Sequence, residues 1–234
     1  MKAFFTILSL TLTFSLFAQI DTGRVDTLIC RNNTMKYLLK YPDKVDNNDL
    51  QPMLVFLHGA GERGDDLSIV NVHGPLMEEN KHFVKDAYIL TPQCPKGIYW
   101  DTEMLYLLIS KILNSHNIDN SRVYLTGLSM GGWGTWRLSI EHPELFAAIA
   151  PVCPPVDDFI FANIEKIKDI PIWAFHGKKD SVVPVEITQN MIEALQKVGA
   201  SPMVTIYPKT GHNAWSDTYS NPEFYSWLFS HIKQ

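Results

Sequence analysis

Residues 127–132 read Gly-Leu-Ser-Met-Gly-Gly, the Gly-x-Ser-x-Gly pattern that can present a serine for nucleophilic attack. An apolar stretch at 122–127 precedes Ser129, and a helical pattern follows it as far as residue 141. A sharp turn between a strand and a helix needs glycines because a Cβ would clash there, and the helix N-terminus favours negative charge forming nearby. The pattern in this setting predicts that Ser129 is a nucleophile at the carboxyl end of a sheet.

A serine hydroxyl is a poor nucleophile without a base, so the rest of the chain must supply one. In folds with this turn the acid and the histidine follow the serine in the chain. His212 lies in a loop between the last expected strand and the last expected helix. An exposed imidazole in such a loop can reach the serine, so we predict that His212 is the general base.

The acid that orients the imidazole is predicted to be Asp180. It follows the expected strand 170–176, again at the carboxyl end of the sheet, where ligands gather in open α/β folds. Asp157 and Asp158 follow the preceding strand and remain alternatives for the same role. His176 ends a buried strand and is predicted to be structural.

An oxyanion hole requires two backbone N–H groups aimed at the developing negative oxygen. Met130, the residue after the nucleophile, is predicted to supply one. The loop His58-Gly59-Ala60-Gly61 follows an early strand, and Ala60 is predicted to supply the other. His58 is expected to brace this loop by hydrogen bonding. No metal-ligand spacing, GxGxxG motif or P-loop is present in the sequence, so we predict neither a metal nor a cofactor.

The elements that must position these residues alternate between strand-like and helix-like patterns. Short apolar strands interleaved with helices are typical of a mainly parallel sheet covered on both faces. We expect a single α/β domain over residues 19–234, with an antiparallel pair leading into the sheet. Strands are predicted at 25–30, 35–41, 53–58, 87–91, 122–127, 147–152, 170–176 and 203–207, and helices at 102–114, 130–141, 186–198 and 221–233.

The first 18 residues have the layout of a secretory signal peptide. Lys2 precedes an uncharged run rich in Phe, Leu, Ser and Thr, and cleavage is expected near Ala18. An uncleaved membrane anchor is the alternative, although the run is short for a spanning helix. We therefore expect a secreted or periplasmic protein that is not stably inserted in a membrane.

Composition excludes several classes of protein. The chain has 234 residues, of which 46% are hydrophobic and 19% charged, which fits a globular domain. A net charge of -5 supplies no basic field for a nucleic acid, so none is expected as a partner. Cys30, Cys94 and Cys153 are too few and too scattered for a disulfide scaffold or a metal site. Whether two of them form a disulfide is left open.

Six ordered segments resemble the esterase branch of the α/β-hydrolase superfamily, near dienelactone hydrolases, carboxylesterases and the "predicted peptidase" group related to prolyl oligopeptidases. The resemblance covers residue 50 to the end, and it implies an α/β-hydrolase fold with a minimal lid and the same Ser129, Asp180 and His212 triad. The chain departs from that group at Pro154-Pro155, where the group usually carries glycines. The segments are 56–64; 91–95 with Trp100; 122–136; 146–153; 173–177 leading to Asp180, Val183 and Pro184; and 211–215.

The leading functional prediction is a secreted serine esterase that works through an acyl-Ser129 intermediate. A serine peptidase of the prolyl-oligopeptidase type is an alternative, but the chain has no room for a gating propeller. A non-enzymatic binding protein on a hydrolase scaffold is another, although no member of the triad is missing. A lipase is disfavoured because the stretch 154–169 is short for a lid.

Aromatic residues are expected at the rim of the substrate pocket. Tyr99, Trp100 and Trp215 are predicted to be exposed there, with Trp100 and Trp215 binding substrate, whereas Trp133 and Trp136 are assigned to the core. The alternative is that Trp100 and Trp215 pack beneath their own loops. Exposed rings suit a sugar face or an aromatic acyl group. The resembling group includes esterases that remove acetyl or feruloyl groups from plant polysaccharides. We therefore predict short acyl or hydroxycinnamoyl esters, free or carried on a polysaccharide, as substrates.

Overall fold

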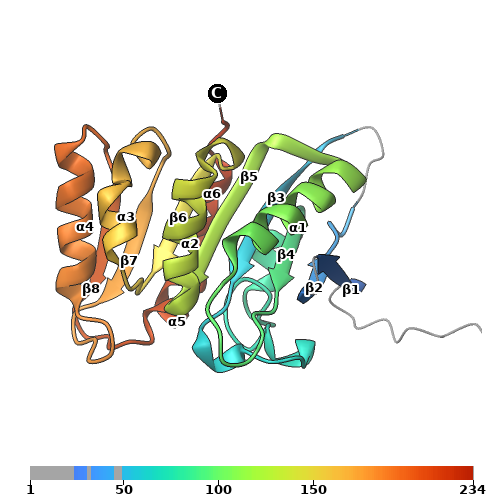
Figure 1. Cartoon of the computed structure of the whole chain (residues 1–234), viewed down its shortest axis with the longest axis horizontal. Helices are drawn as coiled ribbons and strands as arrows, with labels where there is room; N and C mark the ends of the chain where they lie inside the picture. Colours follow the sequence, from blue (N-terminus) through green and yellow to red (C-terminus); the bar gives the residue numbers. More distant parts are fainter. Residues whose placement is uncertain (1–23, 31–32, 45–48, 234) are drawn as a thin grey trace, which may run out of the picture.

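A computed structural model describes residues 24–30, 33–44 and 49–233. The predicted signal peptide lies outside these residues. The described chain forms one eight-stranded sheet flanked by helices (Figure 1). The strands are β1 (Arg24–Cys30), β2 (Asn33–Lys40), β3 (Gln51–Leu57), β4 (Tyr88–Pro92), β5 (Ile118–Leu128), β6 (Ala148–Val152), β7 (Trp173–Gly177) and β8 (Met203–Tyr207).

The strand order across the sheet is β1-β2-β4-β3-β5-β6-β7-β8. β1 pairs with β2 and β2 with β4 in the antiparallel sense, and all remaining neighbours are parallel. Parallel strands are covered on both faces, which explains why β4, β6 and β7 are buried along their whole length. The expected α/β-hydrolase fold, with a mainly parallel sheet, is confirmed.

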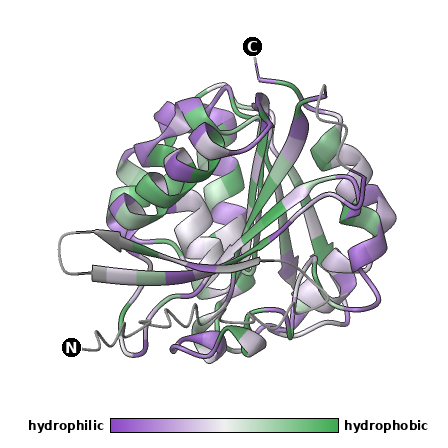
Figure 2. Ribbon diagram, turned by 90° about the vertical axis from the view of Figure 1, so that its right-hand side faces the viewer, coloured by the Kyte–Doolittle hydropathy of each residue, from purple (hydrophilic) through white to green (hydrophobic). Residues whose placement is uncertain are grey.

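Two helical layers cover the sheet (Figure 1), and in the view of Figure 2 the apolar strands lie between them. Successive side chains of β3 lie on opposite faces of the sheet and so enter two different cores. Met53 and Val55 join the core on the side of α1, α2 and α4, whereas Leu54 and Phe56 join the core beneath α5 and α6. The helices are α1 (Thr102–Ser115), α2 (Met130–Glu141), α3 (Asp158–Ala162), α4 (Val185–Lys197), α5 (Ala214–Tyr219) and α6 (Pro222–Phe229).

The structure differs from the expected elements at several boundaries. β5 starts at Ile118, four residues before the predicted strand, because its first part also pairs with the start of β3. The predicted closing helix over 221–233 ends at Phe229. The short helix α5, which follows His212, was not predicted, because six residues are too few to show a helical period.

The segment 154–169 forms α3 and a 3₁₀ helix (Ile164–Ile167) rather than a lid. Ile160, Ile164 and Ile167 are buried in the core beneath α2 and α4. These apolar contacts fix the segment to the helical layer, in agreement with the expected minimal lid. Among the described residues, none of the helices combines the length and the apolar character needed to cross a bilayer.

Candidate active site

Ser129 occupies the tight turn between β5 and α2. Its backbone has φ 52° and ψ -114°, a strained conformation for a residue with a Cβ. Two glycines allow the turn: a Cβ on Gly127 would lie 2.4 Å from the carbonyl oxygen of Gly131, and one on Gly131 would lie 1.9 Å from that of Leu57. The turn therefore requires glycine at both positions, and it presents the Ser129 side chain at the carboxyl end of the sheet.

The structure brings the three predicted triad side chains into one hydrogen-bonded chain. His212 Nε2 lies 2.9 Å from Ser129 Oγ, and His212 Nδ1 lies 2.7 Å from Asp180 Oδ2. The carboxylate can only accept, so Nδ1 carries the proton of the neutral imidazole and Nε2 is free to accept the serine proton. Ser129, Asp180 and His212 follow β5, β7 and β8, so the parallel sheet is what brings them together.

Asp180 is held by four N–H groups. Its Oδ1 accepts from the backbone of Val182 at 2.8 Å and of Val183 at 2.9 Å. Its Oδ2 accepts from His212 and lies 3.1 Å from Nε2 of His176. Burial alone would raise the pKa of Asp180, but the bonds from His212 and the two backbone groups outweigh it and hold this pKa below its usual value. The carboxylate stays charged and fixed beside His212.

His176 has a contact that the sequence did not reveal. It was predicted to be structural, and its buried Nδ1 does meet the Thr188 hydroxyl at 2.8 Å. Its Nε2 lies 2.9 Å from the carbonyl oxygen of Val183, which can only accept, so Nε2 carries the proton and also points it at Asp180. Burial lowers the pKa of His176, which keeps the ring neutral. In the sequence, the available sign of the contact between His176 and Asp180 is that the two residues are four positions apart.

Cys153 lies behind the triad in a left-handed conformation, with φ 46°. Its thiol donates to the carbonyl oxygen of His212 at 3.2 Å, and burial raises its pKa to about 12. Among the described residues, one group of side chains could share a metal ion: atoms of Cys153, His176 and Asp180 lie within 4.8 Å of one another. These atoms also contact the triad and one another: the thiol donates to the carbonyl oxygen of His212, and His176 Nε2 lies 3.1 Å from Asp180 Oδ2.

The loop after β3 lies against the nucleophile turn. A Cβ on Gly59 would lie 2.7 Å from the Leu128 side chain, the residue before Ser129. Ala60 follows and begins a 3₁₀ helix, and Met130 begins α2. The first N–H groups of a helix have no partner within it, so both of these residues carry donors that can serve an incoming oxygen.

His58 braces this loop, as expected. The ring is fully buried, with Nδ1 2.6 Å from the carbonyl oxygen of Gly59 and Nε2 accepting from the backbone N–H of Cys94 at 3.0 Å. Burial lowers the pKa of His58 to about 4. Arg63 adds a bond to the carbonyl oxygen of Ile98 at 3.1 Å. The loop is therefore tied to the segment after β4.

The structure corrects the expected rim of aromatics. Trp100 is only 3% exposed, because its ring packs against His58 and against the backbone of Gly134, and it is not available to a substrate. Trp215 is half-buried and its ring meets the His212 ring edge-on at 5.3 Å. Trp136 is in the core as predicted, and Trp133 is half-buried and packs against that core.

The two alternative acids lie elsewhere. Asp157 accepts from the indole N–H of Trp133 at 2.8 Å and from the backbone of Ile160 at 2.9 Å, which caps α3. Asp158 is exposed in the first turn of the same helix. Of the three candidate carboxylates, Asp180 is the one in contact with His212. Cys94 and Cys153, two of the three cysteines considered for a disulfide, are buried free thiols.

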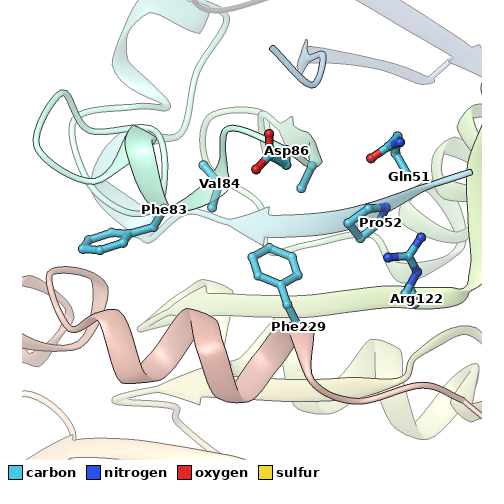
Figure 3. A pocket seen from close by; sticks show the side chains of 8 residues that line it. Gln51, Pro52, Phe83, Val84, Asp86, Arg122 and Phe229 are labelled. Atoms are coloured by element: carbon cyan, nitrogen blue, oxygen red, sulfur yellow. The ribbon is translucent and has the colours of Figure 1, made fainter. Parts of the chain in front are cut away.

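A separate cavity of about 270 Å³ opens at the other end of the parallel strands (Figure 3). Gln51 begins β3, Ala87 precedes β4, and Arg122 precedes the part of β5 that runs beside Met53 of β3. The cavity therefore lies far along the sheet from Ser129. Its lining is formed by Gln51, Pro52, Phe83, Val84, Asp86, Ala87, Arg122 and Phe229.

In this arrangement His212 can take the Ser129 proton while Asp180 stabilises the resulting imidazolium. A doubly covered parallel sheet and a nucleophile turn after β5 define the α/β-hydrolase class. Residues 101–223, more than half of the chain, match the dienelactone hydrolase family. The chain belongs to the dienelactone hydrolase family.

Several known proteins share this sequence pattern or fold. The chain is 27% identical to a bifunctional acetylxylan esterase/xylanase of Neocallimastix patriciarum over 61% of this chain, but over only 21% of that relative. It is 35% identical to a thermostable esterase of known structure, with a TM-score of 0.82 over 92% of this chain and 64% of the other. A ferulic acid esterase shares the fold, with a TM-score of 0.68 at 17% identity over 88% of this chain and 98% of the other. The chain thus spans about a fifth of the curated relative and just under two thirds of the thermostable esterase.

Proposed function

We propose that the protein is a serine esterase that hydrolyses short acyl or hydroxycinnamoyl esters carried on carbohydrate. The observation that carries this proposal is the hydrogen-bonded chain from Ser129 Oγ through His212 to Asp180, with distances of 2.9 and 2.7 Å. A hydroxyl, a neutral imidazole and a charged carboxylate in this order are the parts that acyl transfer to serine requires.

In the first half of the reaction, Ser129 Oγ attacks the ester carbonyl carbon while its proton moves to His212 Nε2. The negative oxygen of the tetrahedral intermediate accepts hydrogen bonds from the N–H groups of Met130 and Ala60. The bond to the alcohol oxygen then breaks, and His212 gives its proton to that oxygen. The alcohol leaves, and the acyl group remains on Ser129.

In the second half, a water molecule replaces the alcohol. His212 Nε2 takes a proton from the water as its oxygen attacks the acyl carbon, and the same two N–H groups stabilise the new oxyanion. When this intermediate breaks down, the proton returns to Ser129 Oγ and the free acid leaves. Asp180 keeps its charge throughout and holds the imidazole in the productive tautomer.

The relatives support esters of this kind as substrates. One is an acetylxylan esterase/xylanase and another chain with the same fold is a ferulic acid esterase. The segment 154–169, packed into the helical layer, offers no apolar lid for a long lipid chain. Both observations favour short acyl groups and an open site over lipid substrates.

A labelling experiment tests the nucleophile and a substrate panel tests the specificity. Incubation with a fluorophosphonate followed by peptide mapping should modify Ser129, and Ser129→Ala should abolish the label. The enzyme should cleave p-nitrophenyl acetate, methyl ferulate and acetylated xylotetraose much faster than a p-nitrophenyl ester of a long fatty acid or a peptide anilide. Label on another residue would refute the assigned nucleophile, and preference for the anilide would favour the peptidase alternative.

We also infer that the protein is exported and that residues 1–18 are removed. Lys2, the apolar run and Ala18 support this inference. N-terminal sequencing of the protein recovered from the periplasm or medium should begin at residue 19. Recovery of the intact N-terminus in the membrane fraction would contradict it and favour an anchor.

A further inference from the structure

An aromatic pair lies one helical turn from the nucleophile. Tyr99, in the loop between β4 and α1, is 60% exposed. Its ring meets the ring of Trp133 edge-on, with centroids 5.5 Å apart and planes at 80°. The backbone N–H of Trp133 donates to the carbonyl oxygen of Ser129 at 3.0 Å, which closes the first turn of α2. The backbone of Trp133 therefore lies one helical turn from Ser129 along α2.

The orientation of the Trp133 ring is fixed. Its indole N–H donates to Asp157 Oδ2 at 2.8 Å, and the other oxygen of that carboxylate caps α3 through the N–H of Ile160. The guanidinium of Arg137, one turn further along α2, lies 3.9 Å from the same Oδ2. A ring held in this way loses little conformational entropy when a ligand stacks on it, which favours binding.

The carboxylate of Asp157 also adds a polar element beside the rings. Its side chain is 41% exposed. An ionised carboxylate has about four acceptor positions, so it can accept from ligand hydroxyls in addition to the two N–H groups that it already binds. Flat apolar faces beside an exposed acceptor match a pyranose ring, which has C–H groups on its faces and hydroxyls at its edge.

We propose that Tyr99, Trp133 and Asp157 form a subsite for a sugar ring in the alcohol part of the substrate. The acyl group must be in contact with Ser129 itself, whereas this pair begins one helical turn away at an open surface. The proposal rests on the proposed function, because it assumes that the ester is carried on carbohydrate. In this proposal, Tyr99 and Trp133 take the substrate-binding role that was expected of Trp100, which is buried.

Tyr99→Ala tests the subsite, since the exposed side chain can be removed without opening the core. We expect the ratio of kcat/KM for acetylated xylotetraose to kcat/KM for p-nitrophenyl acetate to fall about three- to tenfold. Tyr99→Phe, which keeps the ring, should retain most of the ratio. Ile98→Ala is the matched control, because Ile98 is also exposed in the same loop and is not part of the subsite.

A binding measurement separates this proposal from the proposed function. In the Ser129→Ala background, titration calorimetry with unmodified xylotetraose should give saturable binding, and Tyr99→Ala should raise the dissociation constant about three- to tenfold. Failure of the wild type to cleave any carbohydrate ester, with sugar binding intact, would refute the proposed substrate and leave the subsite standing. Absence of binding, equal affinities for both variants, or a Tyr99→Ala loss confined to methyl ferulate would overturn the subsite.

Discussion

Acidification from about pH 7 to about pH 4 should place a proton on the buried ring of His58 and destabilise the protein. The neutral ring donates from Nδ1 to the Gly59 carbonyl oxygen and accepts at Nε2 from the Cys94 N–H. A second proton on Nε2 would point at that N–H group, so the hydrogen bond would be lost. The Glu62 carboxylate lies 3.9 Å from Nδ1. Burial is the largest cause of the lowered pKa of His58, and the positive charge of Arg63 lowers it further.

The size of this effect follows from the pKa of His58, which burial lowers from 6.5 to about 4. Between these two values the unfolded chain binds a proton that the folded chain does not, so the free energy of unfolding falls as the pH falls. A difference of this size corresponds to about 2 kcal/mol lost between pH 7 and pH 5, and to about 3 kcal/mol by pH 4. Near neutral pH, His58 no longer makes the free energy of unfolding depend on pH.

Urea unfolding of the wild type and of His58→Gln, from pH 7 to pH 4, measures this loss. Glutamine has no proton to gain, so its free energy of unfolding should fall by about 2 to 3 kcal/mol less than that of the wild type over the range. His176, whose pKa is also lowered by burial, contributes equally in both proteins and cancels in the difference. Parallel curves for the two proteins would refute the reasoning, because they would mean that His58 takes up its proton without penalty.

The remaining predictions concern the site and the turn that carries it. Ser129→Ala and His212→Ala should each remove most activity toward p-nitrophenyl acetate, and the double variant should lose little more, because the triad acts as a unit. Asp180→Asn should fold normally by circular dichroism but lose about 10⁴-fold in kcat, because it favours the wrong imidazole tautomer. His176→Asn should lower kcat about tenfold and shift the low-field proton resonance of the His212–Asp180 bond, because the carboxylate loses a donor. Gly131→Ala should cost about 3 kcal/mol or more in urea unfolding, because its Cβ would lie 1.9 Å from a backbone oxygen.

Matched variants distinguish these effects from general damage. Gly61→Ala is the control for the turn, because a Cβ there would meet no atom within 4 Å, and it should unfold like the wild type. Asp157→Asn is the control for Asp180→Asn, because Asp157 is an alternative candidate for the acid. If Asp157→Asn lost as much activity toward p-nitrophenyl acetate as Asp180→Asn, the role given to Asp180 would be wrong. An unshifted resonance in His176→Asn would reduce His176 to a packing residue.

Local patterns were enough to predict the elements of the sheet and the position of Ser129. The nucleophile turn is encoded within six residues, because glycines at 127 and 131 are what its close backbone contacts demand. The strands β4, β6 and β7 are visible as short apolar runs, because parallel strands are buried on both faces. Boundaries such as the early start of β5 depend on pairing with a distant strand, which no local pattern records.

Which side chains meet around Ser129 was decided by tertiary structure. Asp180 and Asp157 both follow buried strands, and only the packing of the loops after β7 and β8 sets Asp180 against His212. The second contact of Asp180, with His176, likewise depends on how the loop after β7 folds back.

The sequence predicted the exposure of Tyr99 and the burial of Trp136, but not the burial of Trp100. Trp100 and Trp133 have the same side chain, and neither local pattern says which one will be covered. Trp100 is buried because its ring packs against His58 and Gly134, whereas Trp133 packs against the core, stays half-buried and contacts the exposed Tyr99. The sequence by itself determined the fold class and the position of Ser129 in a tight turn between a strand and a helix, because both depend on residues close together in the chain. The sequence predicted Asp180 as the acid but left Asp157 and Asp158 open, and it did not show which aromatic rings are exposed. Both points depend on long-range packing between loops, so the tertiary structure decided them.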